Sequence, residues 1–359
     1  MSLGDRLTAR ALELCRVPSP TGQERALADR IEAWARNLPG PVPVFRRGHS
    51  LVVGTLDDSR PSVVLGGHLD TVPEHESAGP PRVEGDRLVA RGASDMKGGL
   101  AVMMELAEAL PRQGPALNAL YLFYEAEEGP YRESGLGPLF EALPGLAKAK
   151  LAVMLEPSDG AVMVGCMGTL HASLCFRGKT AHSARPWQGD NAIYHAAPLL
   201  AELAARPRRE VQVGGLTFFE VMTVTTAAGG RARNVVPDRF ELNLNYRFAP
   251  GKSLGAAQAE VEALVAGRAE VEFVDLAPSG RVCDDNPLVR QLLAATGRPA
   301  RPKQAWTDVA RFSELGVDAV NYGPGETSQA HQEHESAPVA TFVEAYQTLA
   351  AFLSAPSRA

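Results

Sequence analysis

The hydrophobic positions of this chain change their spacing from segment to segment. Residues 4–37 carry apolar side chains at helical spacing, as at Leu7, Ala11 and Leu14, interrupted by the sequence VPSPTGQE. This pattern predicts two helices. Short apolar runs flanked by turn residues follow at 51–56, 62–66, 117–124 and 150–155, and a helical stretch lies at 97–110. Strands and helices that alternate in this way are typical of βαβ units.

The pattern changes in the middle of the chain. Longer alternating strands are predicted at 170–177, 219–226 and 240–248, with helices near 191–205 and 253–266. From about residue 278 the alternation of short strands and helices returns, with a helix at 287–295, a strand at 318–322 and a last helix at 339–353. We therefore predict an α/β domain with a mixed central sheet, formed by residues 1–167 and 279–359, and an inserted α+β domain at 168–278.

Length and composition fit a globular protein that acts on small molecules. A chain of 359 residues exceeds the usual size of a single hydrophobic core, so two domains are expected. Its residues are 45% hydrophobic and 22% charged, which is ordinary for a globular fold. The net charge of −6 comes from 36 basic and 42 acidic residues without a long basic run. This distribution argues against nucleic acid and anionic membranes as partners.

Cysteine usage and the N-terminal sequence predict a cytoplasmic protein. The four cysteines, Cys15, Cys166, Cys175 and Cys283, show no CxxC spacing, so a thiolate zinc site and a dense disulfide framework are not expected. The first twenty residues lack a basic segment followed by an apolar stretch of signal-peptide length. No apolar run reaches the roughly 18 residues of a membrane span.

Acidic and imidazole side chains follow the predicted strands at the points where those strands end. They are His68 and Asp70 in GGHLDTVP, Asp95 in GASDMKGG, Glu127 and Glu128 in YEAEEG, Glu156 in LEPSDG, and His331 in GETSQAHQEHE. Ligand sites of open α/β sheets lie beyond the carboxyl ends of the strands. Imidazole and carboxylate together suit zinc, and two metals about 3.5–4 Å apart need one shared ligand. Asp95 is the natural bridge.

Several of these residues have a structural interpretation as well. His68 and Asp70 can simply satisfy each other; on an extended strand both face one side, where the carboxylate can hold the second imidazole nitrogen. Asp95 can cap the helix that follows it, and Glu156 can be a solvated residue at a strand end. His331 and His334 compete as the ligand, and spacing alone does not choose between them.

The adjacent pair Glu127 and Glu128 is harder to explain structurally. It follows the apolar run YLFYEA at a turn. Neighbouring side chains diverge on an extended chain, so one carboxylate can bind metal while the other faces a water. Only a metal makes such a water acidic enough, near neutral pH, for a carboxylate to take its proton.

Together these motifs resemble the two-zinc amidohydrolases that include acetylornithine deacetylase, aminoacylase, carboxypeptidase G and succinyl-diaminopimelate desuccinylase. GHLDTVP, GASDMKGG, AEEG, EP and a late AHxxxE occur in that family's order over essentially the whole chain. The resemblance implies a zinc-exopeptidase-like catalytic domain with a ferredoxin-like lid. It also implies His68, Asp95 and Glu156 on one zinc and Asp95, Glu128 and His331 on the other, with Asp70 behind His68. His334, where the family usually has asparagine or aspartate, would then be structural.

The same resemblance implies a mechanism in which Glu127 takes a proton from a zinc-bound water that attacks an acyl carbonyl. RGKTAHSARPWQGDNAI resembles the family's lid motif, in which a histidine reaches the substrate carbonyl oxygen from the other subunit of a homodimer; here that residue is His182. RNVVPD and NYRFAP resemble the lid's substrate-holding stretches, which makes Asn234 and Arg247 candidates for hydrogen-bonding the substrate and pairing with a carboxylate.

Within the family, AHSARPWQGDNAI, NYRFAP, WTDVARF and VNYGPG look most like desuccinylases of the actinobacterial kind, which release succinate from N-succinyl-diaminopimelate in lysine synthesis. Gly323, in VNYGPG, is then a candidate for substrate binding. Many desuccinylases carry a basic residue before the hinge GS or GT, whereas this chain has Cys166-Met167-Gly168-Thr169. Arg185 could supply that charge from the lid.

Other functions remain open at this point. Acetylornithine deacetylase, another N-acyl-amino-acid hydrolase or a carboxypeptidase would use the same metal ligands. Cobalt or manganese could replace zinc at such nitrogen and oxygen sites. A non-catalytic protein with structural zinc is a further alternative, but a closed structural site needs no spare carboxylate such as Glu127.

Overall fold

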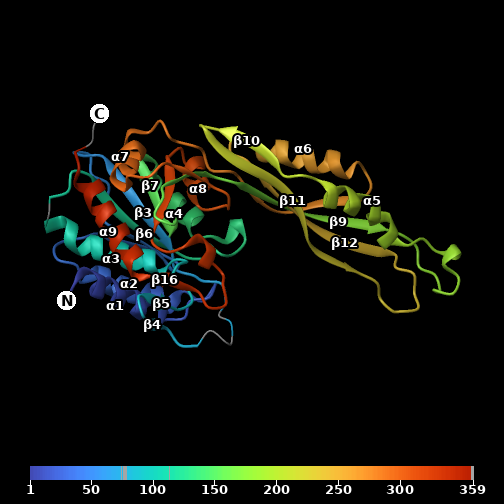
Figure 1. Ribbon diagram of the computed structural model, residues 1–359, viewed down its shortest axis with the longest axis horizontal. Helices are drawn as coiled ribbons and strands as arrows, with labels where there is room; N and C mark the ends of the chain where they lie inside the picture. The colour runs from blue at the N-terminus through green and yellow to red at the C-terminus, as the bar shows by residue number, and fades with distance from the viewer. Residues whose placement is uncertain (74, 76–78, 113, 357–359) are drawn as a thin grey trace. The chain divides into compact units, whose positions relative to one another are not determined.

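The computed structural model describes residues 1–73, 75, 79–112 and 114–356 (Figure 1). The chain divides into two compact units. The first unit comprises Met1–Gly165, Arg281–Lys303 and Asp308–Ala359, and the second comprises Cys166–Gly280 and Gln304–Thr307. The short segment 304–307 therefore belongs with the inserted unit.

An eight-stranded mixed sheet forms the centre of the first unit, in the order β1-β2-β6-β3-β7-β15-β8-β14. Its strands are β1 (Val44–Arg47), β2 (Ser50–Val53), β3 (Ser62–His68), β6 (Asn118–Tyr124), β7 (Leu151–Pro157), β8 (Met163–Cys166), β14 (Arg301–Lys303) and β15 (Ala319–Gly323). Strand β3 runs parallel to β6 and β7, and β15 runs parallel to β7. The carboxyl ends of these four strands consequently meet at one edge of the sheet.

Helices cover this sheet. They are α1 (Leu3–Cys15), α2 (Arg25–Arg36), α3 (Lys97–Ala109), α4 (Leu136–Ala142), α7 (Pro287–Thr296), α8 (Val309–Glu314) and α9 (Val339–Ser354). Helix α3 is almost wholly buried because it packs on β3, β6 and β7 and is itself covered by α1 and α9. A small sheet of β4 (Arg82–Glu84), β5 (Arg87–Val89) and β16 (Ser336–Pro338) links the segment before Asp95 to the segment after His331.

The second unit is a five-stranded antiparallel sheet in the order β10-β11-β12-β9-β13. Its elements are β9 (Gly168–Arg177), α5 (Ala192–Ala205), β10 (Arg209–Val213), β11 (Leu216–Gly229), β12 (Arg239–Phe248), α6 (Leu254–Val265) and β13 (Glu270–Ala277). Alternate residues of β9 and β12, such as Leu174 and Leu244, pack with Leu199 of α5 and Val261 of α6 in one apolar core. Both helices lie against the sheet in Figure 1.

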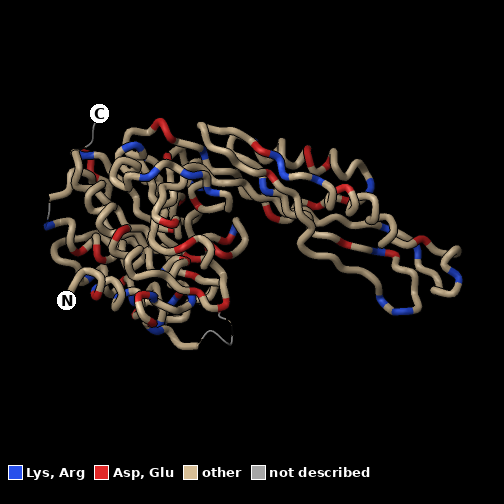
Figure 2. The backbone as a smooth tube through the Cα atoms, viewed as in Figure 1, with Lys and Arg blue, Asp and Glu red and all other residues tan. Residues whose placement is uncertain are grey.

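This architecture confirms the predicted fold class, a mixed α/β unit with a separate α+β unit. The sequence pattern missed the short or solvent-exposed elements, among them β1, β8, β10, β13, β14 and α8. Figure 2 shows basic and acidic residues interspersed in both units. Among the described residues, no helix has the length and apolar character that a membrane span requires.

Candidate metal centre

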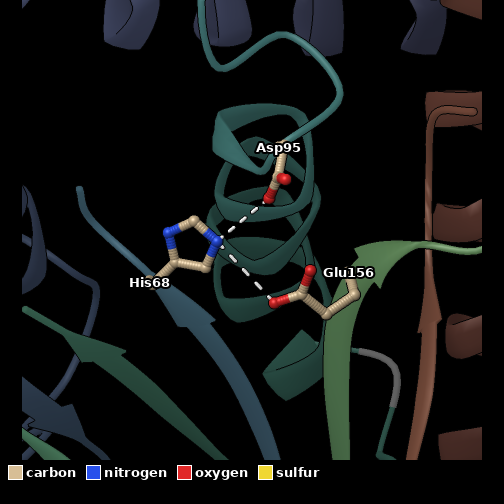
Figure 3. A group of neighbouring side chains, drawn as sticks. All are labelled: His68, Asp95 and Glu156. Atoms are coloured by element: carbon tan, nitrogen blue, oxygen red, sulfur yellow. Dashed lines mark hydrogen bonds and ion pairs between the residues drawn. The ribbon is translucent and has the colours of Figure 1, made fainter. Parts of the chain in front are cut away.

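The ends of two neighbouring strands and the start of α3 bring three of the predicted ligands together (Figure 3). His68 is the last residue of β3, Glu156 lies near the end of β7, and Asp95 precedes α3. One ring nitrogen, His68 Nε2, lies 3.1 Å from Asp95 Oδ1 and 3.7 Å from Glu156 Oε1. All three side chains are buried. They form a group that could hold a metal ion.

A second group uses the other oxygen of Asp95. His331 Nε2 lies 3.0 Å from a Glu128 carboxylate oxygen and 3.7 Å from Asp95 Oδ2. Asp95 therefore presents Oδ1 to one histidine and Oδ2 to another, which is the arrangement that a bridging ligand between two cations requires. The structure brings His331 to this group, whereas His334 is exposed and has only Glu333 within ion-pair distance among the described residues.

Glu127 lies beside both groups. One carboxylate oxygen of Glu127, one of Glu128 and a ring nitrogen of His68 all lie within 4.8 Å of one another. Removal from water, together with the negative charges of Glu156 and Asp308, raises the pKa of Glu127 well above its ordinary value, and the charge of His68 opposes the shift. Positive charge at this position would relieve the repulsion.

The Asp70 carboxylate fixes the backbone at Glu127 and Glu128. Its carboxylate oxygens accept hydrogen bonds from the backbone N–H groups of Glu127 and Glu128, each at 3.0 Å, and from the Thr21 hydroxyl. Strand β3 ends at His68, and His68 Nδ1 lies 2.9 Å from the backbone oxygen of Asp70 but 3.5 Å from its Oδ1. The Asp70 carboxylate therefore lies within ion-pair distance of the imidazole, as expected from the sequence, and the Asp70 carbonyl oxygen lies closer still.

The side chains present fit a pair of divalent cations. Burial first, and then the Asp95 charge, raise the pKa of Glu156 to about 7. Glu156 Oε1 is buried without a hydrogen-bond partner among the described residues. Such an oxygen is costly unless a cation or a donor meets it. Two imidazoles and three carboxylates, with one carboxylate shared, are the donor set that zinc, cobalt or manganese accepts.

The alternative role of Asp95 as a helix cap is wrong. The N-cap of α3 is Met96, and no side chain caps it. The Asp95 backbone is held instead by Glu335, a buried residue at the end of the AHxxxE motif that had no predicted role. Glu335 Oε1 accepts from the N–H groups of Ser94 and Asp95, each at 2.9 Å. Its Oε2 accepts from Gly92 N–H and from Arg91 Nη1, each at 3.0 Å.

Glu335 lies four residues after His331, so it connects the loop of one ligand to the backbone of another. The sequence held one signal for this role. Glu335 is the final glutamate of the AHxxxE motif, although the sequence does not show that it is buried. Only the tertiary structure identifies its partners, which lie 240 or more residues away in sequence.

Gly323 ends β15 beside the strand that carries Glu156. A Cβ atom at this glycine would lie 2.2 Å from the backbone oxygen of Leu155 and 2.7 Å from that of Glu156. The close approach of two backbones therefore requires glycine here. This packing role is separate from the substrate contact expected from the sequence.

The remaining predicted residues belong to the second unit. His182 and Arg185 are exposed in the segment between β9 and α5, and Asn234 lies in the loop before β12. Arg247 lies on β12, where its Nε donates to Asn245 Oδ1 at 3.1 Å and burial lowers its pKa. His182 Nδ1 accepts a hydrogen bond from Ala184 N–H at 3.0 Å. A neutral His182 therefore carries its proton on Nε2 and can donate it.

Comparison with known proteins extends this picture. The model of peptidase family M20/M25/M40 matches residues 64–355. A putative succinyl-diaminopimelate desuccinylase of Mycobacterium tuberculosis is 38% identical over 338 residues, which cover 94% of this chain and 95% of the relative. The succinyl-diaminopimelate desuccinylase of Corynebacterium glutamicum is 37% identical over 361 residues, covering 98% and 97%.

A solved structure supports the fold. Aminopeptidase PepT from Bacillus cereus superposes with a TM-score of 0.79 at 21% identity, covering 98% of each chain. At this level of identity the likeness concerns the fold alone.

Proposed function

This chain belongs to peptidase family M20/M25/M40 and is a metallohydrolase, and on that premise we propose that it hydrolyses N-succinyl-L,L-2,6-diaminopimelate to succinate and diaminopimelate, a step of lysine synthesis. The observation that carries the chemistry is the shared position of Asp95 between two ligand groups, with Glu127 beside them. The choice of substrate is supported by the two desuccinylases that resemble the chain over almost its full length.

Two zinc ions are the proposed cofactors. His68, Asp95 and Glu156 would hold one ion, and Asp95, Glu128 and His331 the other. When bound, the ions supply Lewis acidity toward the acyl carbonyl and toward the attacking water. Asp70 and Glu335 keep the ligands in place through the backbone N–H groups of Glu127, Glu128 and Asp95.

Glu127 is the proposed general base. It removes a proton from the attacking water and returns that proton to the leaving amine nitrogen. Its backbone is fixed by Asp70, and its side chain shares the cluster with His68 and Glu128. The proton thus remains on one carboxyl group between the two steps.

His182 is proposed to stabilise the oxyanion from the partner subunit of a homodimer. The tautomer set by Ala184 leaves Nε2–H available as a donor to the former carbonyl oxygen. Dimerisation through the second unit is supported by β11. Its residues 221–229 contain no charged side chain, and the outer edge of this stretch pairs with none of the strands the structure describes. Such an edge is a template for a second copy of the strand.

Arg185, Asn234, Arg247 and Gly323 are the proposed contacts to the rest of the substrate. Arg247 is the best supported of these, since its half-buried guanidinium has only Asn245 as a hydrogen-bond partner among the described residues. A carboxylate would satisfy its remaining N–H groups.

A zinc titration tests the proposed function. Metal-free protein receives zinc in steps while amine release from N-succinyl-L,L-diaminopimelate is followed. We expect activity to rise to a plateau at two zinc ions per chain. Full zinc loading without amide hydrolysis would instead support a non-catalytic zinc protein. Sedimentation tests the dimer, and a fully active monomer would contradict the role of His182 from the partner.

A further inference from the structure

One face of the sheet in the second unit carries a network of polar side chains. Leu244 and Tyr246 of β12 pack in the apolar core that α5 and α6 share with the sheet. Successive side chains of a strand point to opposite faces, so Asn243, Asn245 and Arg247 lie together on the other face. Asn245 is only 9% exposed there, although asparagine is usually an exposed residue. A buried amide of this kind is held in place by its hydrogen bonds.

Both ends of the Asn245 amide have partners. Its Nδ2 lies 2.9 Å from His171 Nε2 and donates to the Thr169 hydroxyl at 3.1 Å, and its Oδ1 accepts from Arg247 Nε at 3.1 Å. In the pairing of β12 with β9, His171 lies opposite Asn245, and Thr169 lies opposite Arg247. An arginine can only donate, so it selects the amide oxygen, while a neutral imidazole and a hydroxyl can both accept from the amide nitrogen. The orientation of the Asn245 amide is therefore fixed from both ends.

The hydrogen bond at Nε restricts how Arg247 can meet a ligand. A guanidinium binds a carboxylate through two parallel N–H groups, either Nε with one Nη or the two Nη groups together. Asn245 occupies Nε, and neither Nη group has a hydrogen-bond partner among the residues that the structure describes. The end of the guanidinium formed by the two Nη groups is thus the one presented to a ligand. Holding a flexible side chain in one orientation before the ligand arrives reduces the entropy lost on binding.

We propose that Asn245 is a positioning residue for Arg247, held in its orientation by His171 and Thr169, so that Arg247 binds the α-carboxylate of the substrate's amine half through its two Nη groups. This inference rests on the proposed function, which supplies an N-acyl amino acid as the substrate. An α-carboxylate occurs in succinyl and acetyl substrates alike. The inference therefore concerns the amine half and does not depend on the acyl group.

The test compares Asn245→Ala with the matched control Asn243→Ala. Asn243 lies on the same strand and face, and its Nδ2 lies 3.1 Å from the other ring nitrogen of His171, but Asn245 is the residue that accepts from Arg247. KM and kcat are measured for N-succinyl-L,L-diaminopimelate and for N-acetylornithine at equal zinc content. We expect Asn245→Ala to raise KM roughly 3- to 10-fold, the usual effect of one lost hydrogen bond, on whichever substrate is hydrolysed. The value of kcat should change little, because the contact holds the ground state and the transition state alike. Asn243→Ala should keep the wild-type KM.

A second background separates positioning from packing. Arg247→Met has no guanidinium to orient, so adding Asn245→Ala should not raise KM further, whereas independent effects would add. Asn245→Asp keeps the size of the side chain if the alanine variant does not fold. Its carboxylate would pair with Arg247 and compete with the substrate, so it should raise KM at least as much. If Asn245→Ala raises KM by the same factor in both backgrounds, or no more than Asn243→Ala does, the network only supports the sheet and the inference is overturned.

His171 gives a test by rescue. His171→Ala removes an acceptor from the Asn245 amide and should raise KM in the same direction, whereas His171→Gln supplies an oxygen that can accept from this amide. We expect the glutamine variant to recover most of the lost affinity. Equal KM values for the two variants, both above wild type, would show that the ring acts by packing alone and would contradict its role in orienting Asn245.

The two claims fail separately. Calorimetry with L,L-diaminopimelate, which keeps the α-carboxylates but has no amide to hydrolyse, measures Kd without turnover. If wild type hydrolyses the succinyl substrate but the Asn245 variants keep its KM, the inference is wrong and the proposed function stands. If wild type hydrolyses neither substrate, the proposed function is wrong and Kd decides on Asn245. A Kd that rises in Asn245→Ala only while Arg247 is present supports the inference, and a Kd independent of Asn245, or no binding, refutes it.

Discussion

Replacement of Glu335 should loosen the metal centre without touching a ligand. Its carboxylate accepts four hydrogen bonds, two at Oε1 from Ser94 and Asp95 N–H, and two at Oε2 from Gly92 N–H and Arg91. Glu335→Ala removes the two acceptor oxygens of these four hydrogen bonds and leaves the buried Arg91 guanidinium without its partner. Breaking a buried ion pair from one side costs about 3–5 kcal/mol. We expect a loss of that size in the free energy of unfolding.

Glu335→Gln should have a smaller effect. The glutamine oxygen can keep one of the two pairs of donors, while its NH₂ group faces the other pair and cannot accept from it. Two unpaired donors at about 1–3 kcal/mol each, partly relieved by relaxation, give an expected loss of about 2–3 kcal/mol. Because Asp95 N–H is one of the donors, zinc affinity should fall about 10- to 100-fold, as for other groups that orient a ligand.

Urea unfolding of the metal-free protein measures the stability term, and competition with a coloured chelator measures zinc affinity. Glu333→Gln is the matched control. That side chain is 47% exposed, and its ion pairs with His75 and His334, at 3.5 and 3.7 Å, are of the kind that contribute little. If Glu335→Ala unfolds at the wild-type urea concentration and binds zinc as tightly as wild type, Glu335 does not position Asp95.

Three further changes test other parts of the account. Glu127→Gln should lower kcat at least about 100-fold while zinc content is retained, because the proton acceptor is lost; metal analysis and amine release check this. Gly323→Ala should destabilise the protein by about 1–3 kcal/mol, since its Cβ would meet the Leu155 and Glu156 backbone oxygens. Thermal unfolding checks this, with Gly137→Ala as the control because a Cβ there meets nothing within 4 Å. Burial acts to raise the pKa of Glu260, but hydrogen bonds from Lys252, Tyr246 and Arg209 lower it to about 2. As the pH falls, the unfolded chain therefore protonates this carboxylate before the folded chain does. The difference in free energy of unfolding between wild type and Glu260→Gln should be largest at about pH 6 and should decrease as the pH falls from about 5 toward 2. Urea unfolding across that range measures this difference.

Each of these predictions has a result that would contradict it. A Glu127→Gln enzyme with more than a few per cent of wild-type activity would require another base. Equal melting temperatures for Gly323→Ala and Gly137→Ala would show that the strands can separate at no cost. A stability difference between wild type and Glu260→Gln that does not change with pH would mean that the Lys252 ion pair, at 2.5 Å, adds nothing to folding.

The sequence predicted the central strands because their side chains are apolar on both faces. Every residue of β3 and β7 is buried, so each appears in the sequence as a continuous apolar run that ends at a polar side chain. The same rule placed His68 and Glu156 at one edge of the sheet. Elements without such a run, such as β14 and the six-residue α8, gave no comparable signal.

The supports of the site could not be predicted in the same way. The contacts of Glu335 and the backbone contacts of Asp70 depend on groups that meet only after folding, and a single sequence contains no periodicity that reveals such pairs. The expected contact between the Asp70 carboxylate and His68 is present at 3.5 Å, although β3 ends two residues before Asp70. The hydrogen bonds that the same carboxylate accepts from the backbone N–H groups of Glu127 and Glu128 had no signal in the sequence.

The central claim is that this metallohydrolase removes succinate from N-succinyl-L,L-diaminopimelate. The most direct test is amine release by the zinc-loaded protein from that substrate and, side by side, from N-acetylornithine. We expect a strong preference for the succinyl substrate in kcat/KM. A preference for the acetyl substrate, or hydrolysis of neither, would contradict it and move the substrate to another N-acyl amino acid or a peptide.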